Sequence, residues 1–158
     1  LSFIKNLVTD MNYIINSIWS YDLEIKACDL ENGDLDYKFP IVIQNNHKDP
    51  IDDVSKGSSA MKEIIDLAFK IVAMKYLGLQ NTPLMLDELG RGMDTEHKIK
   101  TIELIKQIND EHIFSQIFMI SHDILHYGAL SNTQICVICD ANIVLPKGCV
   151  FNQHVTIA

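Results

Sequence analysis

Two adjacent acidic residues stand at the end of an apolar run in PLMLDELGRGMD, residues 83–94. Neighbouring side chains on a strand point to opposite faces, so Asp87 and Glu88 cannot both decorate the same surface of a sheet. One of them is expected to face a site, because a carboxylate can hold a divalent metal ion and a second can polarise water. For an isolated pair, the plainer interpretation is a helix cap at Asp87 and a solvated Glu88.

A second polar segment, VSKGS at residues 54–58, precedes a long apolar pattern of helical spacing. The Ser55 hydroxyl, the Gly57 amide and the amino end of the following helix form an arrangement that suits an anion. Lys56 either attracts a phosphate directly or points to solvent. The segment is therefore a candidate anion-binding site.

A histidine, His122, directly follows the apolar run FSQIFMIS. A structural hydrogen bond at a helix start is the simple explanation for such a residue. HDILH also places His122 and His126 one helical turn apart, as in a zinc pair, but it departs from HExxH and no third ligand is marked. In the strand-like CVIC run, the thiols of Cys136 and Cys139 face opposite ways and no second pair completes a zinc site.

Composition limits the class of protein. A chain of 158 residues with 47% hydrophobic residues can form one α/β domain with a real core. The net charge of −8 argues against a surface devoted to nucleic acid as a whole. Four scattered cysteines, no apolar run long enough for a bilayer and no secretory signal predict a cytoplasmic protein without a membrane segment.

Hydrophobic periodicity predicts the elements that position these residues. The first half is expected to contain an entering helix at 3–19, a hairpin of YDLEIKAC and YKFPIVIQN around the turn signal Asn32-Gly33, and a helix that is capped by Ser55 or Ser58 and stops at Gly78. Next come the strand PLMLD, buried on two faces, a helix capped near Asp94 or Thr95, and the buried strand FSQIFMIS. The chain then continues with the short helix HDILHYGAL and a terminal strand pair of QICVICD and NIVLPKGCVF. Pro40 suggests an edge position or a bulge in the hairpin.

Buried strands that alternate with helices predict an α/β fold with a mostly parallel sheet. Ligands bind such sheets at the carboxyl ends of the strands. Asp87, Glu88, Ser121 and His122 all lie at such ends.

Four segments together carry a resemblance to a known family. VSKGS, LMLDE, GRGMD and FMISHD resemble the signature motif, Walker B strand, D-loop and switch-histidine loop of an ABC-type ATPase, in the family's order and approximate spacing. The entering helix and the hairpin further resemble the carboxyl-terminal lobe of the SMC and SbcC group, in which a coiled coil separates two half-domains. The sequence around the signature motif is similar to that of ATPase subunits of recombination nucleases from tailed bacteriophages.

The resemblance implies a role for each matching residue. Asp87 would hold Mg²⁺, Glu88 would act as the general base and His122 would contact the γ-phosphate of ATP. The implied nucleotide contacts, made partly to ATP bound by another subunit, are Ser55, Lys56, Gly57, Ser58 and Asp94.

Several residues depart from the family pattern. Val54 replaces Leu, Lys56 replaces the first Gly of the signature, and Ser58 replaces Gln or Glu. Arg91 and Gly92 replace the usual D-loop residues, so the resemblance gives little support for assigning the family's D-loop roles to these two positions. An ordinary helix N-cap explains Asp94 almost as well as a position at the dimer interface.

The sequence contains no G-x-x-x-x-G-K-[ST] phosphate loop. Without that loop the chain alone is expected to be inactive and to bind ATP weakly. The resemblance then implies a helix leading from a coiled coil at 1–20 and a carboxyl-terminal ATPase lobe at 21–158. The implied partners are an amino-terminal lobe with the phosphate loop, a second copy of the head, an SbcD-like nuclease subunit and double-stranded DNA. An SMC-type chromosome-organising clamp and a non-hydrolysing interaction module are the alternatives.

Overall fold

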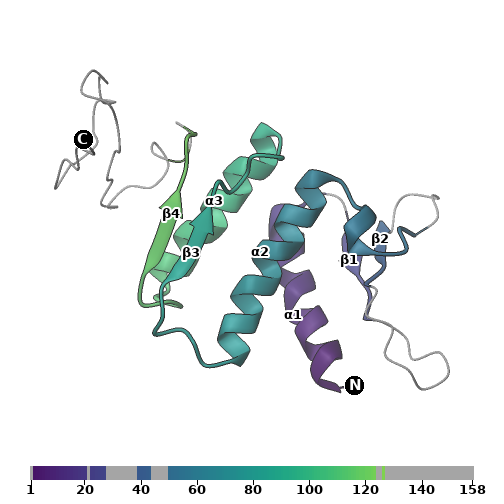
Figure 1. The fold of residues 1–158 in the computed structure, drawn as a ribbon, viewed down its shortest axis with the longest axis horizontal. Helices are drawn as coiled ribbons and strands as arrows, with labels where there is room; N and C mark the ends of the chain where they lie inside the picture. The colour runs from purple at the N-terminus through teal and green to yellow at the C-terminus, as the bar shows by residue number, and fades with distance from the viewer. Residues whose placement is uncertain (1, 21, 28–38, 44–49, 124–125, 127–158) are drawn as a thin grey trace, which may run out of the picture. The chain divides into compact units, whose positions relative to one another are not determined.

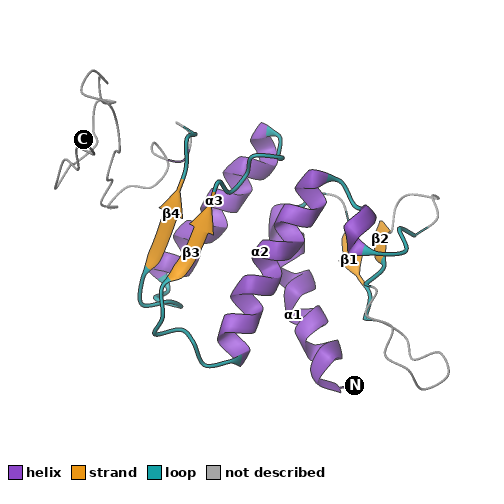
Figure 2. Ribbon diagram, viewed as in Figure 1, coloured by secondary structure: helices purple, strands orange, loops and turns teal. Residues whose placement is uncertain are grey.

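A computed structural model describes residues 2–20, 22–27, 39–43, 50–123 and 126 of the chain (Figure 1). The elements in chain order are α1 (Ser2–Ile18), β1 (Leu23–Ile25), β2 (Ile41–Ile43), the 3-10 turn η1 (Val54–Lys56), α2 (Ser59–Tyr76), β3 (Leu84–Asp87), α3 (Thr95–Asp110) and β4 (Ile117–Ile120), and Figure 2 shows them by type. All of them belong to the first of two compact units, residues 1–121; the second unit is residues 122–158.

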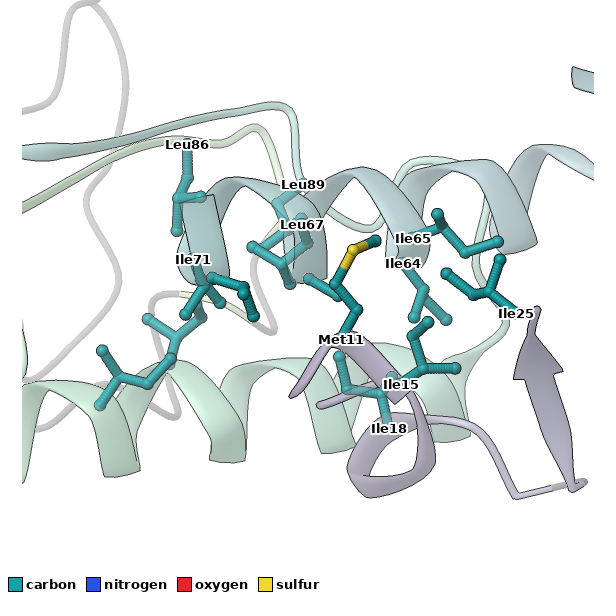
Figure 3. Packing of buried hydrophobic residues seen from close by; sticks show 14 of the residues in the cluster. Met11, Ile15, Ile18, Ile25, Ile64, Ile65, Leu67, Ile71, Leu86 and Leu89 are labelled. Atoms are coloured by element: carbon teal, nitrogen blue, oxygen red, sulfur yellow. The ribbon is translucent and has the colours of Figure 1, made fainter. Parts of the chain in front are cut away.

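The core of the first unit forms where α1 packs against α2 (Figure 3). On α1 the buried residues recur every three or four positions, which gives the helix one apolar face: Val8, Met11, Ile15 and Ile18. On α2 the six residues predicted to be buried are all buried: Ile64, Ile65, Leu67, Ala68, Ile71 and Val72. Each large side chain that is fully buried contributes about 1.5–3 kcal/mol of hydrophobic stabilisation.

Local sequence signals set both ends of α2. The Ser58 hydroxyl accepts a hydrogen bond from the Met61 amide at 3.2 Å, so Ser58 is the N-cap and Ser55 is not. At the other end Gly78 adopts φ +68°, and the Leu79 amide donates to the Met74 carbonyl at 2.8 Å. This is the Schellman pattern, which requires a left-handed residue just after the helix, so the predicted stop at Gly78 is confirmed.

The hairpin is antiparallel, with Leu23 opposite Ile43, as the sequence predicts. Its predicted Asn32-Gly33 turn lies outside the described residues. Asn12 of α1 holds the hairpin, because its side-chain amide donates to the Ile25 carbonyl and its side-chain oxygen accepts from the Ile25 amide, both at 2.8 Å.

The second sheet consists of β3 and β4, which are parallel and joined through α3. Leu84 lies opposite Ile117 and Asp87 lies opposite Ile120, so the two strands end at the same edge. This agrees with the predicted parallel α/β arrangement.

One prediction about this sheet was wrong for the described part of the chain. β3 and β4 were expected to be buried on both faces, but burial alternates along β3, with Leu84 and Leu86 buried. The opposite face remains exposed, with 57% of Met85, 46% of Phe118 and 55% of Ile120 accessible to solvent. The physical reason is that residues 1–121 supply a covering layer for one face only.

The remaining predicted elements, the terminal strand pair and most of the helix after His122, lie outside the described residues. Of that helix, the structure shows the His126 amide donating to the Asp123 carbonyl at 3.1 Å. None of the described helices combines the length and apolar character needed to cross a membrane.

Candidate functional site

The acid pair lies where β3 ends. Asp87 is the last residue of the strand and is exposed, and the next amide, that of Glu88, donates to the Ile120 carbonyl of β4 at 3.0 Å. This bond extends the ladder by one step, so the acids stand beside the end of β4 and its next residue, Ser121. Of the four residues predicted to meet at this edge, Asp87, Glu88 and Ser121 lie at or directly after the ends of the two paired strands, whereas His122 belongs to the second unit.

Glu88 has an unusual backbone conformation. Its φ is +47°, in the left-handed region that residues with a side chain seldom adopt. Such conformations cost about 1–3 kcal/mol and cluster at functional sites, because the surrounding structure must enforce them. The outlier marks Glu88 as a candidate functional residue on structural grounds alone.

The Glu88 carboxylate is paired with Arg91. One guanidinium nitrogen of Arg91 donates to Glu88 Oε2 at 2.7 Å, and the Arg91 amide donates to the Glu88 carbonyl at 3.3 Å. Both side chains are substantially exposed, so the pair contributes no more than about 1 kcal/mol. Arg91 replaces a usual D-loop residue, so the resemblance assigned it no clear role, but the structure gives it a defined contact with the predicted general base.

The turn after the acids is held by a residue that the sequence did not single out. Glu63 of α2 accepts hydrogen bonds from the backbone amides of Gly90 and Gly92. Its partners are 27 and 29 residues away, so no local sequence pattern could have identified it. By its position in an amphipathic helix, Glu63 looks like an ordinary solvated residue.

The VSKGS segment forms a tight 3-10 turn. Asp53 caps it by accepting from the Ser55 amide at 2.8 Å, and the Gly57 amide donates to the Val54 carbonyl at 3.0 Å. In this conformation the Gly57 amide, predicted to bind an anion, has an internal partner. A Cβ at Gly57 would lie 3.1 Å from Ile41 Cδ1, so the close packing of this turn explains the glycine.

Lys56 has a partner that neither of its two interpretations included. Its ammonium group bonds to the Asp52 carboxylate at 2.5 Å, four residues earlier in the chain. The hydrogen bond and the charge of Asp52 raise the pKa of Lys56. The ammonium therefore stays charged at neutral pH, while Asp52 offsets its attraction for a phosphate.

Asp94 is the N-cap of α3, which is the plainer of its two interpretations. Its carboxylate accepts from the His97 amide at 3.0 Å and contacts His97 Nδ1 at 2.7 Å. The hydrogen bond from the His97 amide, followed by that from the imidazole, lowers the pKa of Asp94. The Trp19 ring stacks on the face of the imidazole with a centroid separation of 4.3 Å. A role for Asp94 at a dimer interface stays a prediction.

The first unit brings the two predicted sites into contact through the turn at 90–92. A Cβ at Gly92 would lie only 3.1 Å from the Cβ of Ser59, the residue after Ser58. The loop that follows the acid pair therefore rests on the start of α2, directly after VSKGS. His122 belongs to the second unit, so its predicted contact with γ-phosphate stays a prediction.

Asp87, at the end of β3, is a residue that could hold a metal ion. Among the described residues, no three His, Cys, Asp or Glu side chains gather in a group that could hold a metal. This finding also leaves the His122 and His126 pair without a third zinc ligand in that part of the chain. Mg²⁺ commonly takes one or two carboxylates and completes its shell with phosphates and water, and Asp87 could supply one carboxylate.

Comparison with known proteins gives evidence at the level of the fold. No family model matches the sequence, and no curated protein matches it. A solved structure from work on the ATP-driven dimerization and DNA-stimulated activation of SMC ATPases matches with a TM-score of 0.64 and 16% identity. The match covers 88% of this chain and 81% of that one. The chain has a fold similar to that of an SMC ATPase.

Proposed function

We propose that this chain is the carboxyl-terminal half of an ATP-hydrolysing head of the SMC and SbcC group. The head would dimerise on ATP and gate a recombination or repair nuclease, an SbcD-like subunit, on double-stranded DNA. The observation that carries the proposal is the Asp87-Glu88 pair at the shared end of two parallel strands, with Glu88 in a left-handed conformation. The fold similarity to an SMC ATPase supports it.

In this proposal each residue has a separate task. Mg²⁺ bound with ATP would neutralise charge on the phosphate oxygens, and Asp87 would help to hold it. Glu88 would accept a proton from the attacking water, after its carboxylate leaves Arg91. His122 would contact the γ-phosphate.

The nucleotide would lie between two heads. Ser55, Lys56, Gly57 and Ser58 of one head would face ATP held by the other, with Asp94 near the interface. The Gly57 amide is bonded to Val54 in the present conformation, so direct binding through it requires a local rearrangement of η1.

An amino-terminal lobe carrying the phosphate loop would complete the head. The chain has no phosphate loop of its own. Parallel sheets normally have both faces covered, whereas the described part of the chain covers only one face of β3 and β4. We call this chain together with such a lobe the completed head.

ATP turnover by the completed head tests the proposal. Glu88→Gln keeps the size of the side chain but removes the base, so we expect kcat to fall at least about a hundredfold. Glu103→Gln, an exposed position on α3, is the matched control and should keep wild-type turnover. Equal turnover in Glu88→Gln and wild type would remove Glu88 from the reaction.

Two other functions are separated by simple observations. The fold similarity to an SMC ATPase favours a chromosome-organising clamp as the second candidate. Co-purification of a nuclease subunit with the completed head distinguishes the nuclease assembly from the clamp. Measurable turnover excludes the third candidate, a non-hydrolysing interaction module.

A further inference from the structure

Glu63 makes an unusual pair of contacts for a helix side chain. Its two carboxylate oxygens accept from two backbone amides of the same turn, Oε1 from Gly90 and Oε2 from Gly92, the latter at 3.1 Å. Hydrogen bonds to an ionised acceptor are about twice as strong as those between neutral groups. A single half-buried side chain of α2 therefore fixes the turn at both of its glycines.

The backbone of the turn is shaped for this contact. Gly90 adopts φ +88°, a conformation that favours glycine. Gly92 lies so close to α2 that an added Cβ would be 3.1 Å from Ser59 Cβ and 3.4 Å from the Ala60 amide nitrogen. The turn thus rests on the first turns of the helix, and Glu63 supplies the polar contact there.

The turn that Glu63 holds connects the predicted chemical residues. It begins after Glu88 and ends at Asp94, and the residue between the two bonded amides, Arg91, binds the Glu88 carboxylate. The helix that carries Glu63 starts directly after the VSKGS segment. A displacement of that helix start would therefore move the Glu88 loop with it.

We propose that Glu63 is a positioning residue for ATP hydrolysis: its carboxylate ties the loop from Glu88 to Asp94 to the helix after VSKGS. The tie keeps the general base in its left-handed conformation and couples its placement to the segment that would meet the second head's nucleotide. This inference rests on the proposed function, because it assigns Glu63 a part in the same reaction.

The test uses Glu63→Gln with Asp66→Asn as the matched control. A glutamine has one acceptor oxygen, so its NH₂ group faces one of the two amides instead of accepting from it. Asp66 lies on the same helix, its side chain is 71% exposed, and its ion pair is with Lys70. The first readout is amide hydrogen exchange at Gly90 and Gly92 in this chain. We expect exchange to accelerate at least about tenfold in Glu63→Gln and to stay unchanged in Asp66→Asn.

The second readout is steady-state hydrolysis by the completed head. We expect Glu63→Gln to lower kcat about tenfold per folded head, with KM for ATP within about twofold of wild type, in addition to the loss of stability that the missing hydrogen bond causes. A merely structural role would lower stability and leave kcat of the folded fraction unchanged, which would overturn the inference.

The two readouts distinguish failure of the Glu63 contact from failure of the proposed function. Unchanged amide exchange in Glu63→Gln would refute the tie by itself, whatever the activity. A wild-type completed head that binds ATP without turning it over would refute the proposed function, and the role of Glu63 in hydrolysis with it.

Discussion

At the scale of single residues, the chemistry depends on where a few carboxylates find partners. Glu88 is paired with Arg91, Asp94 caps α3, and Glu63 binds two backbone amides. The first two were identifiable from sequence, because an acid after an apolar strand and an acid before a helix are local signals. The third was not, because its partners are distant in the chain. Sequence thus indicates which acids matter only where their partners are near.

Asp94 provides a residue-scale prediction about stability and pH. Asp94→Ala removes the acceptor for the His97 amide and should lower the urea midpoint of unfolding, whereas Asp94→Asn should retain most of the cap. Because the pKa of Asp94 is lowered in the folded chain, its ionised form stabilises the fold. That contribution is complete above the unfolded pKa of about 3.9 and is lost as pH falls through the lower folded value.

Urea unfolding at neutral pH and between about pH 4 and pH 2 checks both parts of this prediction. The acid-dependent loss of stability should be smaller in Asp94→Asn than in wild type, since asparagine does not titrate. Identical acid profiles for the two proteins would show that the carboxylate charge contributes nothing.

At the scale of elements, helix boundaries were the most predictable part of the fold. Ser58, Gly78 and Asp94 act as the start or stop signals that the sequence indicates. The environment of β3 and β4 was less predictable, because a short apolar run reads as a strand covered on both faces. Other segments of the chain determine which faces of a sheet are covered. The sequence of a strand therefore does not reveal whether its second face is covered within the same unit.

The contact of α1 with the hairpin provides an element-scale prediction. Asn12→Ala removes both hydrogen bonds between the Asn12 side chain and Ile25. The backbone amide and carbonyl of Ile25 then have no partner in a partly buried environment. We expect a loss of about 2–3 kcal/mol in the free energy of unfolding. Asn16→Ala, an exposed position on the same helix, is the control and should change stability by less than about 0.5 kcal/mol.

Denaturant unfolding of the two variants measures this difference. Equal stability of Asn12→Ala and Asn16→Ala would show that hydrophobic packing alone, without the Asn12 contact, holds α1 to the hairpin.

At the scale of the whole molecule, the proposed function makes this chain one half of a head, which requires a partner lobe. The first unit has a complete core on one side of β3 and β4 and an apolar surface on the other, formed by Met85, Phe118 and Ile120. We name the amino-terminal lobe with the phosphate loop as its expected occupant, because a parallel sheet with an uncovered apolar face is unusual and the chain has no phosphate loop.

Phe118→Asp tests that occupant. A charge on this face should weaken binding of the amino-terminal lobe at least about tenfold while the stability of this chain stays within about 0.5 kcal/mol of wild type. Phe69→Asp, at a similarly exposed position on α2, should leave lobe binding unchanged. If Phe118→Asp destabilises the isolated chain instead, residues 122–158 cover the face and the lobe binds elsewhere.

The proposed function requires ATP to join two copies of the completed head, and sedimentation velocity of the Glu88→Gln head measures whether it does. This variant should bind ATP without consuming it, so adding ATP and Mg²⁺ should double the sedimenting mass. With Ser55→Arg added to Glu88→Gln, the head should keep the sedimenting mass of a single copy in the presence of ATP. Ser115→Arg, at an exposed position after α3, is the control, and a head that carries it should still double its sedimenting mass. A mass that stays the same with and without bound ATP would show that ATP does not join two heads.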